Sequence, residues 1–385
     1  MKAKRILALL LAAVLLLALC ACGGNGNTAS NTAAPDTQTA APTATPEATP
    51  EATPDAAADE TPADTAPETM EYTDDLGRTM TLPGQITRVV VTGPLAQTIV
   101  FAVAPDLMVA VANEWNPGTE NYLKQEYLDL PVLGQLYGGK STLNLEELLA
   151  TAPQVVLDVG EAKEGTAEDL DKLAEQTGIP FVHINSSSLG AANAFRRLGE
   201  LLDRAEAGEA LASYCEEKNA YFESVMEQVG EGRMSLLYLL GDKGLNVIAK
   251  GSYHGEIFDL LGDNAAVLDS PSSKGTGNET DMEQILLWNP DFIIFSFDAV
   301  SVDVNDPAWQ QLKAIQNGNY ATAPYGPYNW MGFPPSVQLY LGMLWMMDTM
   351  YPEFADYDLQ SEVNRYFDLF YHCTLNDEQY AAIIG

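Results

Sequence analysis

The chain contains an internal repeat, and this repeat constrains its fold more than any other feature of the sequence. The segment NLEELLATAPQVVL at residues 144–157 returns as DMEQILLWNPDFII at residues 281–294. In each copy a capping residue, Asn144 or Asp281, begins a predicted helix, a proline ends it, and a short β-rich strand follows. This pattern, used twice, predicts an α/β fold with two similar lobes, mainly parallel sheets flanked by helices, and a ligand cleft between the lobes.

The first 22 residues have the layout of an export signal. Lys2, Lys4 and Arg5 precede an uncharged apolar run that ends in the sequence LCACG at residues 19–23. This ending resembles the bacterial lipobox, which implies cleavage before Cys22 and a diacylglycerol group on its thiol. We therefore expect an exported protein that is lipid-anchored to the outer face of the cytoplasmic membrane. An ordinary cleaved signal peptide and an uncleaved anchor are the alternatives.

Residues 23–70 consist mainly of alanine, threonine, proline and acidic residues, with almost no larger apolar side chain. Such a composition cannot bury a core, so the segment is predicted to be a disordered tether. The rest of the chain divides into a predicted N-terminal lobe at residues 71–187, a connecting helix at 188–230, interrupted near 204–205, and a C-terminal lobe at 231–385.

The chain is strongly acidic, with a formal net charge of −35. Such a charge argues against nucleic acid or anionic lipid as partners and speeds the approach of cations, although solubility alone is the simpler explanation. After Cys22 only Cys215 and Cys373 remain. They could pair outside the cell, but their spacing is not that of a metal site.

Local patterns predict the order of elements. Before the first copy of the repeat they indicate a hairpin at 72–83, a strand at 88–91, a helix from about residue 95 and a strand at 108–112. After it they indicate a strand at 154–159, a helix at 166–176 and a strand at 180–184. The second lobe begins with a strand at 234–241, and the helical end of the chain is predicted to start with Pro334 and Pro335 in a first turn.

Several of these segments together carry a family resemblance: DDLGRTMTLP, RVVVTGP, both copies of the repeat, KGSYHGEI and LNDEQYAAIIG. In this order they resemble the substrate-binding lipoproteins of ABC importers, in the class that captures iron–siderophore, haem, cobalamin and related metal complexes. The resemblance implies two αβ lobes bridged by a rigid helix, no catalysis and no permanently bound cofactor. It also implies a monomer that works with an ABC permease and its ATPase, and not with nucleic acid.

The resemblance also implies two docking residues. In that family an acidic residue near the start of the repeated helix in each lobe contacts arginines of the permease. The matching residues here are Glu146 and Glu283. Two surface carboxylates on similar lobes would give a two-point ionic contact with a symmetric partner. The alternative is that each glutamate only stabilises the N-terminal dipole of its helix.

The ligand is expected at loops that follow the carboxyl ends of strands, where open αβ sheets bind ligands. Aromatic residues are frequent in these loops and offer broad apolar faces for chelates and macrocycles, while tyrosine adds a phenol oxygen. The predicted ligand-binding residues are Thr92, Gly93, Pro94, Glu114, Trp115, Tyr137, Lys140 and Gly160 in the first lobe and Tyr253, His254, Lys274, Tyr325, Tyr328 and Trp330 in the second.

The candidate metal ligands are His254, which lies in a glycine-flanked turn, and Tyr328. His183 lies inside a predicted strand and is expected to be structural, whereas His372 near the end is expected at the surface. The chain has no H-x-H, H-E-x-x-H or clustered-cysteine motif. A metal that arrives already chelated therefore fits the sequence better than a bare zinc ion.

The expected function is capture of a metal complex for import, foremost an iron–siderophore or related iron chelate, or else haem or cobalamin. Lys140, Lys250 and Lys274 fall in predicted loops near the cleft and would instead favour a molybdate- or tungstate-type oxyanion. A surface lipoprotein for adhesion or wall binding, without transport, is the alternative from another class. No nucleophile-elbow motif supports an enzyme.

Overall fold

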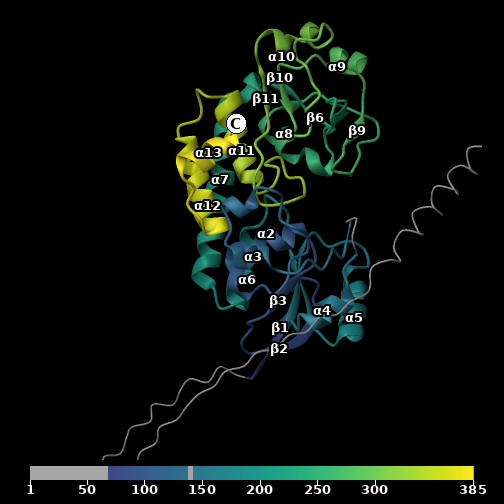
Figure 1. Cartoon of the computed structure of the whole chain (residues 1–385), viewed down its shortest axis with the longest axis vertical. Coiled ribbons are helices and arrows are strands. Elements are labelled where there is room, and N and C mark those ends of the chain that lie inside the picture. The colour runs from purple at the N-terminus through teal and green to yellow at the C-terminus, as the bar shows by residue number, and fades with distance from the viewer. Residues whose placement is uncertain (1–67, 138–141, 385) are drawn as a thin grey trace, which may run out of the picture. The chain divides into compact units, whose positions relative to one another are not determined.

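The computed structural model describes residues 68–137 and 142–384 (Figure 1). Cys22, the predicted tether up to residue 67, and Lys140 lie outside the described residues, so the predictions made for them stay predictions. In the part that is described, no helix is both long enough and apolar enough to cross a bilayer.

The folded part opens with the predicted hairpin. Strand β1 (Thr69–Thr73) pairs antiparallel with β2 (Thr79–Pro83), so regular structure includes the last two residues of the predicted tether, 69 and 70. The carboxylate of Asp74 accepts the backbone N–H groups of Leu76 and Arg78, which closes the turn. Gly77 adopts a φ of 77°, a left-handed conformation that favours glycine.

Three parallel strands form the sheet of the first lobe in the order β3 (Val89–Val91), β4 (Val155–Gly160) and β5 (Phe181–Asn185). Helices α2 (Pro94–Val103) and α5 (Thr166–Thr177) match the predicted helices. The shorter elements of this lobe are η1 (Pro105–Leu107), η2 (Thr119–Asn121) and α3 (Gln125–Leu128).

The predicted strand at residues 108–112 is wrong. Met108 and Val111 make only isolated bridges, and the segment does not continue as a strand. The backbone N–H groups of Val109 and Val111 donate to two different segments, at Val89 and Pro131. At the end of the segment, the amide oxygen of Gln97 on α2 accepts the backbone N–H groups of Ala112 and Asn113. These two donors are therefore not available to a neighbouring strand.

Two helices follow the first lobe where one interrupted connecting helix was predicted. They are α6 (Ala192–Leu201) and α7 (Ala205–Val229), and the break falls at the predicted position. The two helices pack closely because α7 carries Gly208, where a Cβ atom would lie 2.5 Å from the carbonyl oxygen of Phe195. The short η3 (Gly230–Gly232) then leads into the second lobe.

The sheet of the second lobe has the order β11 (Tyr320–Thr322), β10 (Phe292–Phe295), β6 (Ser235–Leu240), β7 (Asn246–Val247) and β9 (Asn278–Glu279), and β8 (Asp263–Asn264) pairs with β6. Strands β11, β10, β6 and β8 pair in parallel, whereas β7 and β9 add antiparallel pairs. Helical segments of this lobe are η4 (Tyr253–Gly255), α8 (Glu256–Leu261), α9 (Met282–Trp288), η5 (Trp309–Gln311) and α10 (Lys313–Gln316).

The internal repeat is confirmed as a structural repeat. Helix α4 (Leu145–Ala150) precedes β4, and α9 precedes β10 in the same way. The side chain of Asn144 accepts the N–H groups of Glu146 and Glu147, and Asp281 accepts the N–H of Gln284 at 2.8 Å. Each copy therefore begins with the predicted N-cap.

The chain ends in helices α11 (Leu339–Met350), α12 (Leu359–Tyr371) and α13 (Asp377–Ile384). The predicted first turn at Pro334 and Pro335 is wrong, because α11 begins only at Leu339. The preceding residues form turns that are fixed by the side chain of Gln338, whose amide donates to the carbonyl oxygen of Tyr328 at 2.6 Å. Helix α12 packs against α2 of the first lobe, so the predicted C-terminal lobe at 231–385 also contributes to the first.

Strands β3 and β6 are buried on both faces of their sheets, and one core connects the two sheets. In β3 the side chains of Val89 and Val91 join the largest core, whereas Val90 faces a smaller one. In β6 the side chain of Tyr238 joins that same largest core, whereas Leu237 faces a separate one. A shared core that also includes α7 and α11 holds the lobes together.

Candidate functional site

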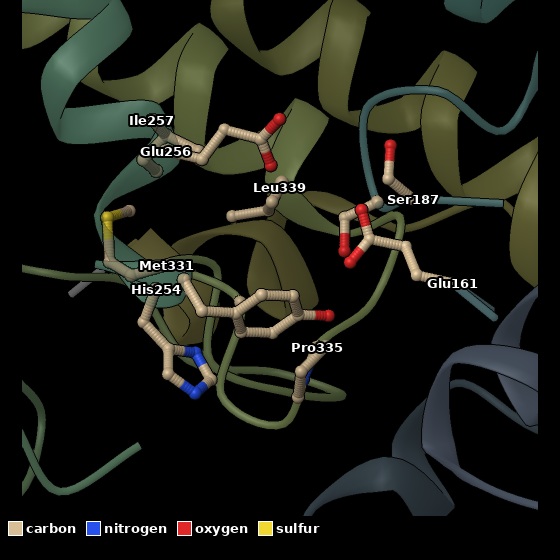
Figure 2. Close-up of a pocket in the computed structure, with 11 residues that line it drawn as sticks. Glu161, Ser187, His254, Glu256, Ile257, Met331, Pro335 and Leu339 are labelled. Carbon is tan, nitrogen blue, oxygen red and sulfur yellow. The ribbon is translucent and has the colours of Figure 1, made fainter. Parts of the chain in front are cut away.

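A cavity of about 160 Å³ is lined by residues of both lobes (Figure 2). Its lining residues are Glu161, Ser187 and Ser188 from the first lobe and Tyr253, His254, Glu256, Ile257, Met331, Gly332, Pro335 and Leu339 from the second. Ile257, Met331 and Leu339 are buried and form an apolar floor. Glu161 and Glu256 are exposed and form a polar rim. The cavity therefore combines an apolar floor with a charged rim.

The register of β4 and β5 explains the contribution of the first lobe. Gly160 at the end of β4 pairs with Asn185 at the end of β5. The residues that follow them, Glu161 and Ser187, therefore leave the sheet at the same edge. This edge is formed by the carboxyl ends of parallel strands, where open αβ sheets place their ligands.

A glycine-rich turn positions the residues of the second lobe. Gly251 adopts a φ of 71°, and its N–H donates to the carboxylate of Asp259 at 2.7 Å. The chain then enters η4, which contains Tyr253 and His254, and continues directly into α8, whose first residue is Glu256. One tight turn thus brings a phenol, an imidazole and a carboxylate to the cavity.

The imidazole of His254 is held by an aromatic stack that continues into the core. Its ring stacks on Phe333 with 4.7 Å between centroids, Phe333 stacks on Tyr238, and Tyr238 stacks on Phe258. Burial lowers the pKa of His254, although a hydrogen bond with the backbone of Gly332 opposes this effect. The imidazole is therefore neutral at pH 7, the form that can ligate a metal.

The carboxylates of Glu161 and Glu256 point into the same space from the two lobes (Figure 2). Burial raises the pKa of Glu256, and the charge of Glu161 raises it further. Burial and both carboxylates also raise the pKa of Tyr253. None of the described residues that line the cavity is lysine or arginine. The rim is therefore negatively charged at neutral pH.

A family model described as periplasmic binding protein matches residues 89–325, which is more than half of the chain. The chain belongs to the periplasmic binding protein family. Two solved structures are similar along most of their length. The first is the ABC transporter solute binding protein of Sulfurospirillum deleyianum, with 27% identity, a TM-score of 0.72 and coverage of 81% of this chain and 98% of that one. The second is a periplasmic solute binding protein of Veillonella parvula, with 26% identity, a TM-score of 0.66 and coverage of 82% of this chain and 97% of that one.

A third similar structure is the molybdate periplasmic binding protein MolA of Haemophilus influenzae, bound to molybdate. It shares 22% identity with a TM-score of 0.59 and coverage of 80% of this chain and 99% of that one, so it shows the fold alone. No curated protein matches the chain. The periplasmic binding protein described here is thus the solute-binding component of an ABC transporter, a non-enzymatic class that works outside the cytoplasm with a permease and an ATPase.

Two of the predicted ligand residues of this periplasmic binding protein, Tyr253 and His254, lie on the cavity wall, and Gly160 immediately precedes the lining residue Glu161. Three others lie elsewhere. Thr92 is buried, and its hydroxyl donates to the carboxylate of Asp158. Gly93 caps helix α2 and Pro94 is its first residue. These three residues shape the end of β3 and the start of α2.

Glu114 and Trp115 line a second cavity of about 420 Å³, which is formed by residues of the first lobe. Tyr137 lines neither cavity. Its hydroxyl lies 3.4 Å from the Asp169 carboxylate, and the ammonium group of Lys163 lies 5.6 Å from its ring centroid. Burial raises the pKa of Tyr137 to about 12, so the phenol is protonated at neutral pH.

The aromatic residues of the segment at 325–330 pack inside the protein. Tyr328 and Trp330 are buried, and neither lines the cavity. The amide of Gln97 on α2 donates to the Tyr328 hydroxyl at 3.0 Å, and the ring of Trp115 lies 5.9 Å from that of Tyr328. This segment therefore joins the second half of the chain to the first lobe. Tyr325 packs on Phe297, with 4.0 Å between ring centroids.

Of the three predicted lysines, the two that the structure describes, Lys250 and Lys274, do not line the cavity. Lys274 is exposed and is not a lining residue, and Lys140 lies outside the described residues. Lys250 binds Asp263 at 2.6 Å. Among the described residues there is also no group of three or more His, Cys, Asp or Glu side chains that could hold a metal ion.

The other two histidines lie where the sequence indicated. His183 is buried in β5, and its Nδ1 lies 2.7 Å from the carboxylate of Asp158. His372 is exposed at the end of α12.

Sequence reasoning missed Glu161, Ser187 and Glu256. Glu161 comes two residues after the strand predicted at 154–159, and Glu256 comes two residues after His254 in a glycine-rich turn. Glu161 could therefore have been predicted as a site residue, because it follows the carboxyl end of a strand. The abundance of acidic residues hid it, since 54 Asp and Glu side chains offer many similar positions.

Proposed function

We propose that this binding protein captures a metal complex, foremost an iron chelate, and delivers it to its ABC permease. The observation that supports this proposal is the cavity between the lobes, where an imidazole, a phenol and two carboxylates surround an apolar floor. Oxygen and nitrogen groups can bind a metal or its coordinated ligands, while an apolar floor suits the organic part of a chelate.

The oxyanion alternative receives no support from the described lining residues. It rested on Lys140, Lys250 and Lys274, and the two that the structure describes do not line the cavity. Carboxylates at the rim would repel molybdate or tungstate. Adhesion without transport receives no support from family membership, because the family consists of solute-binding proteins.

A two-point contact with the permease is the second part of the proposal. Glu146 and Glu283 are both exposed in the first turns of α4 and α9. One turn further along each helix lies an exposed leucine, Leu149 with 49% and Leu287 with 78% of its surface accessible. Residues three or four positions apart share a helix face, so each proposed docking surface presents a carboxylate beside an apolar side chain.

The lipid anchor is the third part. Cys22 in the sequence LCACG is the proposed lipidation site, with the segment up to residue 67 as a tether. Cys22→Ala should move the protein from the membrane fraction to the soluble fraction of cells. Retention of the variant in the membrane fraction would refute lipidation at Cys22.

Ligand capture can be tested by titrating the intrinsic tryptophan fluorescence of the purified protein with ferric siderophores, haem, cobalamin, other metal chelates of either charge, and molybdate. We expect saturable 1:1 binding to one class of metal complex and no response to molybdate. Failure to bind any metal complex, together with binding to cell-wall polymers, would refute the transport proposal.

A further inference from the structure

We propose that the ligand of the interlobe cavity is a compact cation with an apolar part, held between Glu161 of the first lobe and Glu256 of the second. This inference rests on the proposed function and narrows its ligand class. It distinguishes a cationic complex from the anionic chelates and oxyanions that a protein of this fold could otherwise bind.

The first argument is charge. Two carboxylates from different lobes face one cavity, and no described lining residue is lysine or arginine. The remaining polar groups at the cavity are the hydroxyls of Ser187, Ser188 and Tyr253 and the imidazole of His254. An anion would meet two like charges without a basic side chain to balance them, whereas a cation would be bound by both.

The second argument is size. The cavity has a volume of about 160 Å³. Drug-sized ligands occupy pockets of roughly 300–1,000 Å³, so this cavity is suited to a smaller molecule. A compact complex with a few organic groups fits this volume better than a macrocycle.

The third argument is the arrangement of polar and apolar groups. The floor is made of Ile257, Met331 and Leu339, while the two glutamates occupy the rim. A ligand whose apolar part contacts the floor and whose positive charge lies between the glutamates would interact favourably with both parts of the cavity. Because the glutamates belong to different lobes, such a ligand would also link the lobes electrostatically.

The test compares two exchange-inert cobalt(III) complexes of opposite charge by isothermal titration calorimetry at 0.15 M salt. Tris(ethylenediamine)cobalt(III) is cationic and carries methylene groups, whereas hexacyanocobaltate(III) is anionic. Tetraethylammonium serves as a metal-free cation. The proteins are the wild type, Glu161→Gln, Glu256→Gln and the control Glu206→Gln, which removes an exposed charge from α7 outside the cavity lining.

We expect 1:1 binding of the cationic complex and none of the anionic one. Each cavity variant should weaken cation binding about fivefold or more, because it removes one charge-assisted contact, and Glu206→Gln should leave it unchanged. Equal or tighter binding of the anionic complex would overturn the inference. Cation affinity that is the same in all four proteins, or no binding of either cation, would also overturn it.

The outcomes separate this inference from the proposed function. If tetraethylammonium binds through both glutamates and no metal complex binds, the result supports the cation site and contradicts the proposed transport of a metal complex. If an anionic ferric siderophore binds, and both cavity variants bind it as tightly as the wild type does, the result supports the proposed transport of a metal complex and contradicts the cation site.

Discussion

Glu161 and Glu256 reach one cavity from different lobes, and the charge of Glu161 contributes to the raised pKa of Glu256. The ligand-free protein therefore holds two like charges in a partly desolvated space. A bound cation would relieve their repulsion, and this relationship makes the cavity sensitive to pH as well as to substitution.

Affinity for tris(ethylenediamine)cobalt(III) should fall as the pH is lowered. Burial and Glu161 raise the pKa of Glu256, so this carboxylate takes up a proton at a higher pH than usual and loses its charge. His254 also becomes cationic on acidification, although burial lowers its pKa. Both steps disfavour a cation, and we expect a loss of about fivefold or more between pH 7.5 and pH 5.0 in calorimetric titrations.

The variant Glu256→Gln gives the control for this pH dependence. It should bind the cation weakly at pH 7.5 and lose less affinity on acidification than the wild type, because one of the two titrating groups is gone. A profile as steep as that of the wild type would assign the pH dependence to other groups.

The same variant should not destabilise the ligand-free protein. Because the pKa of Glu256 is raised, its contribution to stability is present below its ordinary pKa and is lost as the pH rises through the raised value. At neutral pH the ionised side chain is mildly unfavourable, and its exposure keeps the effect small. We expect a Tm within about 2 °C of the wild type or slightly above it, measured by circular dichroism. A clear drop would identify Glu256 as a structural residue.

Asp158 should be a major determinant of stability. Its carboxylate accepts the Thr92 hydroxyl and contacts Nδ1 of His183 at 2.7 Å, and all three side chains are buried. Asp158→Ala leaves two buried polar groups without this partner, so we expect a loss of about 2–4 kcal/mol in urea denaturation. As a control, Asp171→Ala removes only an exposed partner of Arg78 and should cost less than about 1 kcal/mol. Similar losses in both variants would contradict the role of burial.

The two thiols of the folded part should react slowly. The sequence left their pairing open, and the structure contains Cys215 and Cys373 as free thiols. Burial raises the pKa of Cys215 to about 12 and that of Cys373 to about 11. Because the thiolate is the reactive form, alkylation by iodoacetamide at pH 8 should be at least about a hundredfold slower than for an exposed cysteine. Peptide mass spectrometry before and after denaturation measures this, and a disulfide between the two would contradict it.

Charge reversal at the proposed docks should stop import without affecting ligand capture. Glu146→Lys and Glu283→Lys each replace one of the two proposed docking carboxylates. We expect uptake of the transported ligand to fall at least about tenfold in the double variant, while the affinity of the purified protein stays unchanged. Glu147→Lys, at the next residue of α4, is the matched control. Reduced affinity would instead place the docks at the ligand site.

Much of the fold could be predicted because it depends on local patterns. The caps at Asn144 and Asp281 act through side-chain contacts with backbone groups two or three residues away, and the hairpin turn at Gly77 is equally local. The strand predicted at 108–112 is wrong for a non-local reason, because its backbone donors are divided between two backbone segments and a side chain of α2.

The site was less accessible to prediction. Tyr328 and Trp330 lie in a proline- and glycine-rich segment that is typical of a surface loop, yet the structure buries them against the first lobe. Whether a segment is buried depends on which distant parts of the chain pack against it, and the local sequence does not contain that information.

The sequence by itself determined the two-lobed αβ architecture, because helix caps, prolines and β-rich runs act over a few residues and occur twice in the same order. Only the tertiary structure decided which side chains share the cavity. Glu161 and Glu256 are far apart along the chain, and their electrostatic coupling exists only because folding brings the end of β4 and the start of α8 to opposite sides of one small space.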